Sequence, residues 1–159
     1  MVSGKLIRLI EEHWESLAAR ILKQMHADPR LSHVSALADS ELRERARDIL
    51  EHLEHWLAPS IEHELAERFE LIGRLRHEEG IPLDEVVLSY LILKDRMLEF
   101  VRGQGLSQST LEVYAEGELE HSVGRFFDSM TYHVVRGYCA ALEHAHHHGH
   151  AKTAAGPHH

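Results

Sequence analysis

The sequence has 159 residues, and 17 Lys or Arg against 26 Asp or Glu give it a formal net charge of −9. Its length suits a single domain with its own apolar core. The acidic balance argues against a nucleic-acid partner, because phosphate binding requires a basic face. The one cysteine, Cys139, cannot form an intramolecular disulfide, so we expect a reducing, cytoplasmic location. We expect neither a signal peptide nor membrane insertion, because the longest apolar run, 86–93, is too short for a span.

The apolar residues recur at helical spacing along almost the whole chain, and no segment alternates as a strand would. The first predicted helix covers residues 3–26, and Pro29 should stop it. Loop or short turns should follow as far as Asp39 or Ser40, one of which should cap a second helix that ends near Leu57. The expected apolar faces of these two helices are Ile10, Trp14, Leu17 and Ile21, then Leu42, Ala46, Ile49, Leu50, Leu53, Trp56 and Leu57.

A third predicted helix covers residues 60–79, with Ile61, Leu65, Phe69 and Ile72 on its buried face. The segment EEGIPLDE then reads as a helix stop followed by a helix start. Gly80 suits the left-handed position after a helix, and Pro82 suits the first turn of the next one. Asp84 and Glu85 match the positive end of that helix. We therefore predict a tight corner between the two helices.

The fourth predicted helix, 82–102, carries the apolar run VVLSYLIL. A helix that is apolar on all sides must be surrounded by other helices. We therefore expect this helix at the centre of an all-α fold of five main helices, a helical bundle. An apolar face on this helix or on the first one would also suit the seam of a homodimer. The two interpretations, core and seam, are compatible.

A fifth predicted helix begins at a Ser107 cap and runs to about residue 144. It contains Gly117, Gly124 and Gly137, so we expect a bend or a close helix contact at one of them. Residues 1–145 then form one domain, and the histidine-rich residues 146–159 form a disordered tail. The tail histidines are flexible imidazoles and should bind divalent metal loosely, through His146, His147, His148 and His150.

The sequence contains no catalytic motif, so we expect a protein that is not an enzyme. Cys139 should be a buried, inert thiol. Glu118 and His121 have the spacing of a di-iron ligand pair, but no second inward-facing pair accompanies them, and His52 and His55 lie off the apolar stripe. We expect no metal in the core and no cofactor.

Haem is the alternative cofactor, because haem needs only one well-placed histidine in an apolar pocket. His77, just before the Gly80 turn, is the candidate for that ligand.

Residues 67–101, ERFELIGRLRHEEGIPLDEVVLSYLILKDRMLEFV, resemble the N-terminal sensory domain of RsbT co-antagonist proteins (RsbR/RsbRD type). The segment LIRLIEEHWESLAARILKQM is similar to the first helix of that family, and the resemblance covers roughly residues 6–142. A similar segment occurs in the regulatory N-terminal parts of PucR-like transcription regulators. The residues that match the family pattern are Arg74, Arg76, Gly80, Pro82, Leu83 and Glu85.

The resemblance implies a globin-like, all-α fold without haem, usually dimeric. It also implies a non-enzymatic sensor or input module of bacterial stress signalling, whose signal is a small ligand or a signalling protein. Such domains commonly precede an output domain, and we expect none within these 159 residues. Arg74 and Arg76 could pair with Asp84 or Glu85 and so set the angle between the third and fourth helices. The alternative is that these arginines form a solvated helix end.

Overall fold

The computed structural model describes residues 2–103 and 109–154 and places no strand among them. The all-α class is therefore confirmed, but eight α-helices replace the five main ones that we predicted. The elements are α1 (Val2–Glu12), α2 (Trp14–Ala27), the 3₁₀ turn η1 (Pro29–Leu31), α3 (Ser32–Ser35), α4 (Asp39–Leu50), α5 (Leu53–Trp56), α6 (Glu62–Glu78), α7 (Leu83–Gly103) and α8 (Thr110–Ala154).

Two of the predicted helices are divided. The first breaks at His13, whose φ of −104° and ψ of 20° are not helical. The Nδ1 of His13 lies 2.8 Å from the carbonyl oxygen of Leu9, so the side chain competes for a helix acceptor. The second predicted helix breaks at residues 51–52. In both cases the apolar stripe continues across the break, so periodicity alone could not locate it.

The helix ends also differ in detail from the prediction. α2 ends at Ala27, just before Pro29, as expected. The N-cap of α4 is Ala38, which makes no side-chain cap bond, so the prediction of an Asp39 or Ser40 cap is wrong. Asp39 instead lies 2.8 Å from the ring of His26. The predicted Ser107 cap lies outside the described residues.

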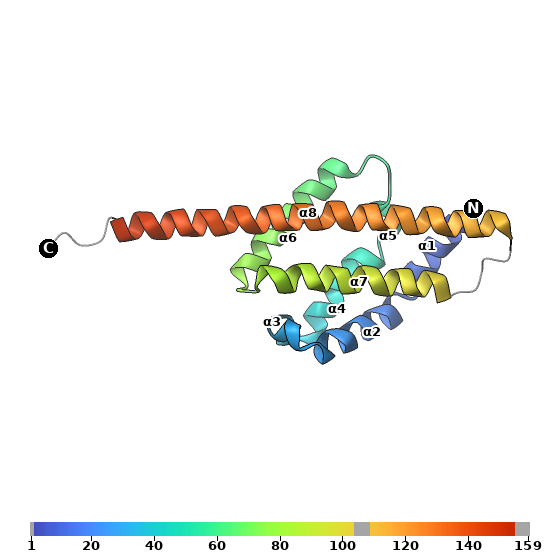
Figure 1. The fold of residues 1–159 in the computed structure, drawn as a ribbon, viewed down its shortest axis with the longest axis horizontal. Helices are drawn as coiled ribbons and strands as arrows, with labels where there is room; N and C mark the ends of the chain where they lie inside the picture. The colour runs from blue at the N-terminus through green and yellow to red at the C-terminus, as the bar shows by residue number, and fades with distance from the viewer. Residues whose placement is uncertain (1, 104–108, 155–159) are drawn as a thin grey trace.

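The helices form layers around α7. Figure 1 shows α8 as the longest element, with α7 running antiparallel beside it and α2 on the far side of α7. α4 packs on α2, and α6 crosses α8. The C-terminal part of α8 projects beyond the rest of the molecule (Figure 1). This helix continues to Ala154, so the structure assigns residues 146–154 to it rather than to a separate tail.

The crossing of α6 and α8 depends on two glycines. A Cβ added to Gly73 would lie 2.0 Å from the carbonyl oxygen of Val134, and one added to Gly137 would lie 2.0 Å from that of Glu70. Each helix thus presents a glycine to the backbone of the other, and any side chain there would force the helices apart. The predicted close contact therefore occurs at Gly137, whereas Gly117 and Gly124 face open space.

The core matches most of the predicted apolar faces. Ile10, Leu17, Ile21, Leu50 and Phe69 are all fully or almost fully buried. From α8 the core takes Leu119, Val123, Phe126, Phe127, Met130, Val134 and Tyr138. Burial of these side chains is the main term that stabilises the fold.

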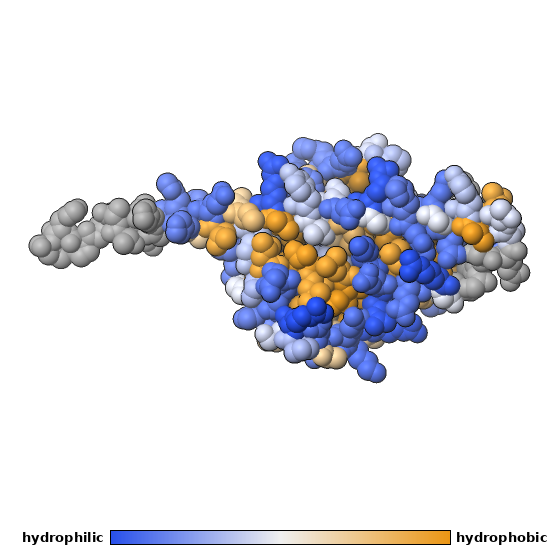
Figure 2. Space-filling model, viewed as in Figure 1, coloured by the Kyte–Doolittle hydropathy of each residue, from blue (hydrophilic) through white to orange (hydrophobic). Residues whose placement is uncertain are grey.

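The fourth predicted helix, now α7, is not covered on every side. Val86, Ile92 and Met97 are buried, but Leu91 is 43% exposed. Figure 2 shows an apolar area in the middle of one face, along the course of α7. The prediction of a completely surrounded helix is therefore wrong at this face. Within the described residues, no helix is both long enough and apolar enough to cross a membrane.

Candidate functional site

The corner between α6 and α7, residues 76–85, has the local geometry that the sequence predicts. Gly80 has a φ of 75°, the left-handed conformation that glycine adopts without steric cost. The N–H of Ile81 donates to the carbonyl of Arg76 at 3.2 Å, and the N–H of Gly80 donates to that of His77 at 3.0 Å. This pair of bonds is a Schellman motif. Pro82 lies just before α7, where its carbonyl accepts from the N–H of Val86 at 3.2 Å.

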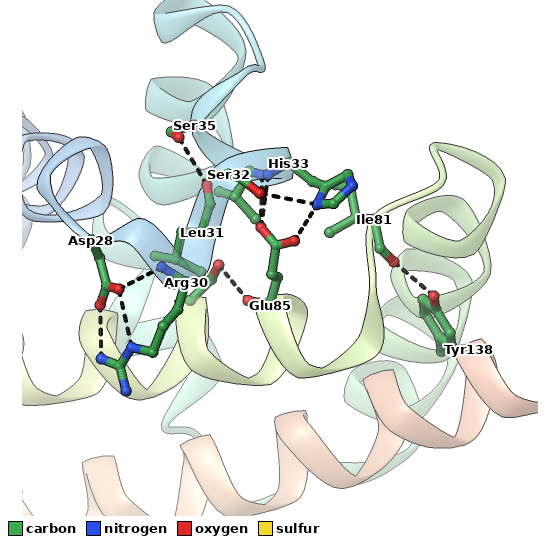
Figure 3. Close-up of polar contacts among 11 residues, drawn as sticks. Asp28, Arg30, Leu31, Ser32, His33, Ser35, Ile81, Glu85 and Tyr138 are labelled. Atoms are coloured by element: carbon green, nitrogen blue, oxygen red, sulfur yellow. Dashed lines mark hydrogen bonds and ion pairs between the residues drawn. The ribbon is translucent and has the colours of Figure 1, made fainter.

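The corner is bound to α8 through Tyr138. The hydroxyl of Tyr138 donates to the carbonyl of Ile81 at 2.7 Å, as Figure 3 shows. Ile81 is 2% exposed and Tyr138 is 9% exposed, so the bond is shielded from water. Burial raises the pKa of the Tyr138 hydroxyl, and the nearby charge of Asp84 raises it further. The hydroxyl therefore remains a neutral donor across the physiological pH range.

Glu85 binds the corner to α3. Its side chain is almost completely buried, and its Oε1 accepts from the N–H of His33 at 2.9 Å and from that of Val34 at 3.2 Å. Oε2 lies within hydrogen-bond distance of the His33 ring (Figure 3). The carboxylate therefore caps a helix distant in sequence by satisfying N–H groups that the first turn leaves unpaired. The prediction that Glu85 pairs with Arg74 or Arg76 is wrong.

The two predicted arginines have different environments. Arg76 has a side chain only 13% exposed, and its Nη1 donates to Glu79 at 2.7 Å. Arg74 has a side chain 59% exposed, and its Nε lies 3.9 Å from Glu78. The proposal of a solvated helix end thus holds for Arg74, whereas Arg76 belongs to the packed corner. Asp84, the other predicted partner, is exposed.

The corner is also bound to α4 through Arg45. The Nη2 of Arg45 donates to Glu79 at 2.6 Å and to Glu41 at 2.9 Å. Glu79 thus bridges Arg45 and Arg76. Tyr90 of α7 lies beside both arginines, and burial raises the pKa of its hydroxyl while Arg76 and Arg45 oppose that rise. Through these contacts one corner connects α3, α4, α7 and α8 with the end of α6.

A cavity of about 680 Å³ opens beside this corner, between α4, α6 and α7. Its volume falls within the range of small-molecule sites. His77, the haem candidate, is not among the lining residues of this cavity. The His77 ring stands edge-on to Tyr138 with centroids 5.3 Å apart, so the described contacts do not aim it into an apolar pocket.

The other candidate ligands are dispersed. His52, His55, Glu118 and His121 are exposed, and Cys139 is half-buried rather than buried. No three His, Cys, Asp or Glu side chains gather into a metal-binding group in the part of the chain that the structure describes. His148 and His150 lie where the structure does not describe side chains.

Comparison with known families identifies the chain. The family described as RsbT co-antagonist protein rsbRD N-terminal domain matches residues 15–152. The chain belongs to this family. The match extends from the start of α2 into the last part of α8 and includes the whole corner. Searches of curated proteins and of solved structures returned no match.

Sequence reasoning missed three contacts of the corner in this RsbRD-type domain. Tyr138 lies at helical spacing among the apolar residues of α8, and that spacing could not reveal a bond to Ile81. Arg45 was not singled out, because it is one of several arginines on a charged helix. The signal available for Glu85 was its place immediately before the apolar run 86–93, where a helical face turns inward.

Proposed function

We propose that the chain is a non-enzymatic sensory or regulatory module of bacterial stress signalling, which acts in the cytoplasm as a globin-like homodimer. Membership of the RsbRD N-terminal domain family supports the role in stress signalling. The single free cysteine supports a reducing compartment. The signal would be a ligand or a protein that shifts the packing of the helices.

The observation that carries this proposal is the set of contacts at the corner. Tyr138 ties the corner to α8, Glu85 ties it to α3, and Arg45 ties it to α4. A displacement of α3 or α4 therefore acts on the same few backbone groups that position α8. Because α8 projects beyond the body of the molecule, its movement is the natural output of such a device (Figure 1).

Exposed leucines support the homodimer. Leu71 and Leu75 of α6 and Leu91 of α7 are each about two-fifths exposed, and α8 exposes Tyr132 and Leu142. Figure 2 shows that apolar residues gather along α7 on one face. Contiguous apolar surface of this kind is typical of protein–protein contacts.

The experiment compares Arg76→Glu with the matched control Arg74→Glu. Reversing the charge at position 76 places two carboxylates side by side in the corner and should lower the free energy of unfolding by about 1–3 kcal/mol. It should also change the monomer–dimer equilibrium, measured by sedimentation. Arg74→Glu should behave as wild type, because Arg74 is solvated. Identical melting and sedimentation of both variants would refute the role of the corner, and a monomeric wild type at all concentrations would refute the homodimer.

A further inference from the structure

The cavity beside the corner separates α4 from α6 and α7. α4 packs extensively on α2, whereas its contacts with α6 and α7 are few. Salt bridges cross the gap instead, from Arg45 to Glu79 at 2.6 Å and from Asp48 to Arg68 at 2.9 Å. The body of the domain therefore contains an open space of about 680 Å³ that charged side chains span at the rim.

The inner walls of this space are apolar. They come from four helices, so the space is a pocket between helices rather than a groove along one helix. The apolar lining includes Met25, Ala46, Ile49, Phe69, Ile72 and Leu93. An apolar molecule that filled the space would bury its surface against these walls and remove it from water. This burial of apolar surface is the main favourable term in binding.

One part of the lining is polar and carries hydrogen-bond donors. It includes Tyr90, Arg76 and Arg45, and the charges of both arginines oppose the rise that burial causes in the pKa of Tyr90. The carboxylates of the lining, Glu41, Glu44, Asp48 and Glu51, each bond to an arginine. Both bonds of Arg45 leave from Nη2, so within the described structure its Nε and Nη1 keep donors without a protein acceptor. Guanidinium N–H groups bind carboxylates through two parallel bonds. Apolar walls with such a group among them suit a molecule that is apolar except for one acidic head.

We infer that this cavity binds an apolar monocarboxylate, whose chain lies among the walls and whose head bonds to Arg45 and Tyr90. This inference deepens the proposed function. The binding itself does not depend on the proposed function, but the regulatory consequence of binding rests on it. A bound carboxylate would share the guanidinium of Arg45 with Glu79, and the contact of Arg45 with Glu79 is the bridge between α4 and the corner. Occupancy of the cavity is thereby coupled to the corner and, through Tyr138, to α8.

The test uses the full chain and two probes of equal chain length, decanoate and decanol, at concentrations where neither forms aggregates. Titration calorimetry should show saturable binding of decanoate, and decanol should bind at least about tenfold more weakly because it lacks the charge-assisted bonds. Arg45→Met should weaken decanoate about tenfold and leave decanol unchanged. The matched control, Arg43→Met on the exposed side of α4, should alter neither.

A second variant tests the place of binding without touching a charge. Ala46→Phe puts a large side chain into the cavity and should abolish binding of both probes while circular dichroism retains the helix content. Equal affinities for the two probes, an equal loss in Arg43→Met, or full binding by Ala46→Phe would each overturn the inference. Absent binding beside an intact dimer that still responds to Arg76→Glu would refute the ligand and leave the regulatory role standing.

Discussion

At the scale of single residues, the corner is built from polar groups placed in apolar surroundings. Glu85 is 3% exposed and would be costly to bury without partners, but it satisfies N–H groups of α3. Tyr138 and Tyr90 bring hydroxyls into the same region from α8 and α7. Replacing any of these groups with an apolar one would leave its partner unpaired in a poorly solvated site, so each position requires its polar group.

The raised pKa values of Tyr90 and Tyr138 predict how the stability of the fold depends on pH. Burial raises the pKa of Tyr90 and Tyr138 in the folded protein, so folding is favoured while both remain protonated. Their contribution to stability is complete below the unfolded value of about 10 and is lost as pH rises through the folded values. An alkaline titration followed by tyrosinate absorbance should show tyrosines that ionise at a higher pH than an ordinary tyrosine does. We call this part of the titration the late component.

The late component should shrink in both Tyr90→Phe and Tyr138→Phe. Tyr132→Phe, which alters an exposed tyrosine of α8, should leave it unchanged. A late component that all three variants reduce equally would contradict the assignment.

At the scale of elements, the crossing of α6 and α8 sets the distance between the corner and α8. Gly73 and Gly137 allow the two backbones to touch, and Tyr138 follows directly after Gly137. The hydroxyl of Tyr138 can reach the carbonyl of Ile81 because the helices are this close. The close packing of two helices and the polar bond at their end are therefore one structural unit.

Gly137→Ala tests this unit. The added methyl would meet the carbonyl oxygen of Glu70 at 2.0 Å and should lower the free energy of unfolding by about 2–3 kcal/mol. Gly124→Ala on the same helix meets nothing within 4 Å and should raise it by about 0.5–1 kcal/mol. Urea unfolding followed by circular dichroism measures both. Equal stabilities of the two variants would show that the helices do not cross at these glycines.

At the scale of the whole molecule, the layers leave a cavity on one side of α7 and an exposed apolar face along it. The cavity lies next to the corner, and the corner contacts the long α8. The proposed signal, its transmission and the output thus occupy neighbouring parts of one small domain. This arrangement requires no catalytic group, because a shift between two packings is sufficient for regulation.

The proposed function does not include haem, and haem binding can be measured directly. Haemin added to the whole chain should give no Soret band that depends on His77, because the His77 ring packs against Tyr138 rather than lining the cavity. Spectra of wild type, His77→Ala and the exposed control His63→Ala provide the comparison. A Soret band that disappears only in His77→Ala would establish the haem-binding alternative.

The sequence by itself determined the elements that depend on local rules. Helical periodicity placed the buried faces, and Gly80 with Pro82 marked the corner, because φ preferences and capping involve neighbouring residues. The same segment carried the family resemblance, which the family match confirms. The breaks at His13 and at residues 51–52 escaped prediction because an apolar stripe passes through them unchanged.

Only the tertiary structure decided what the corner contacts. Glu85 suited the dipole of its own helix as far as the sequence could show, and it instead caps α3, some fifty residues away. Tyr138 and Arg45 join the corner for the same reason: their partners are distant in sequence and are brought near by the crossing of helices. Periodicity specifies which face of a helix is buried, but the partner of a polar group depends on how those faces meet in space.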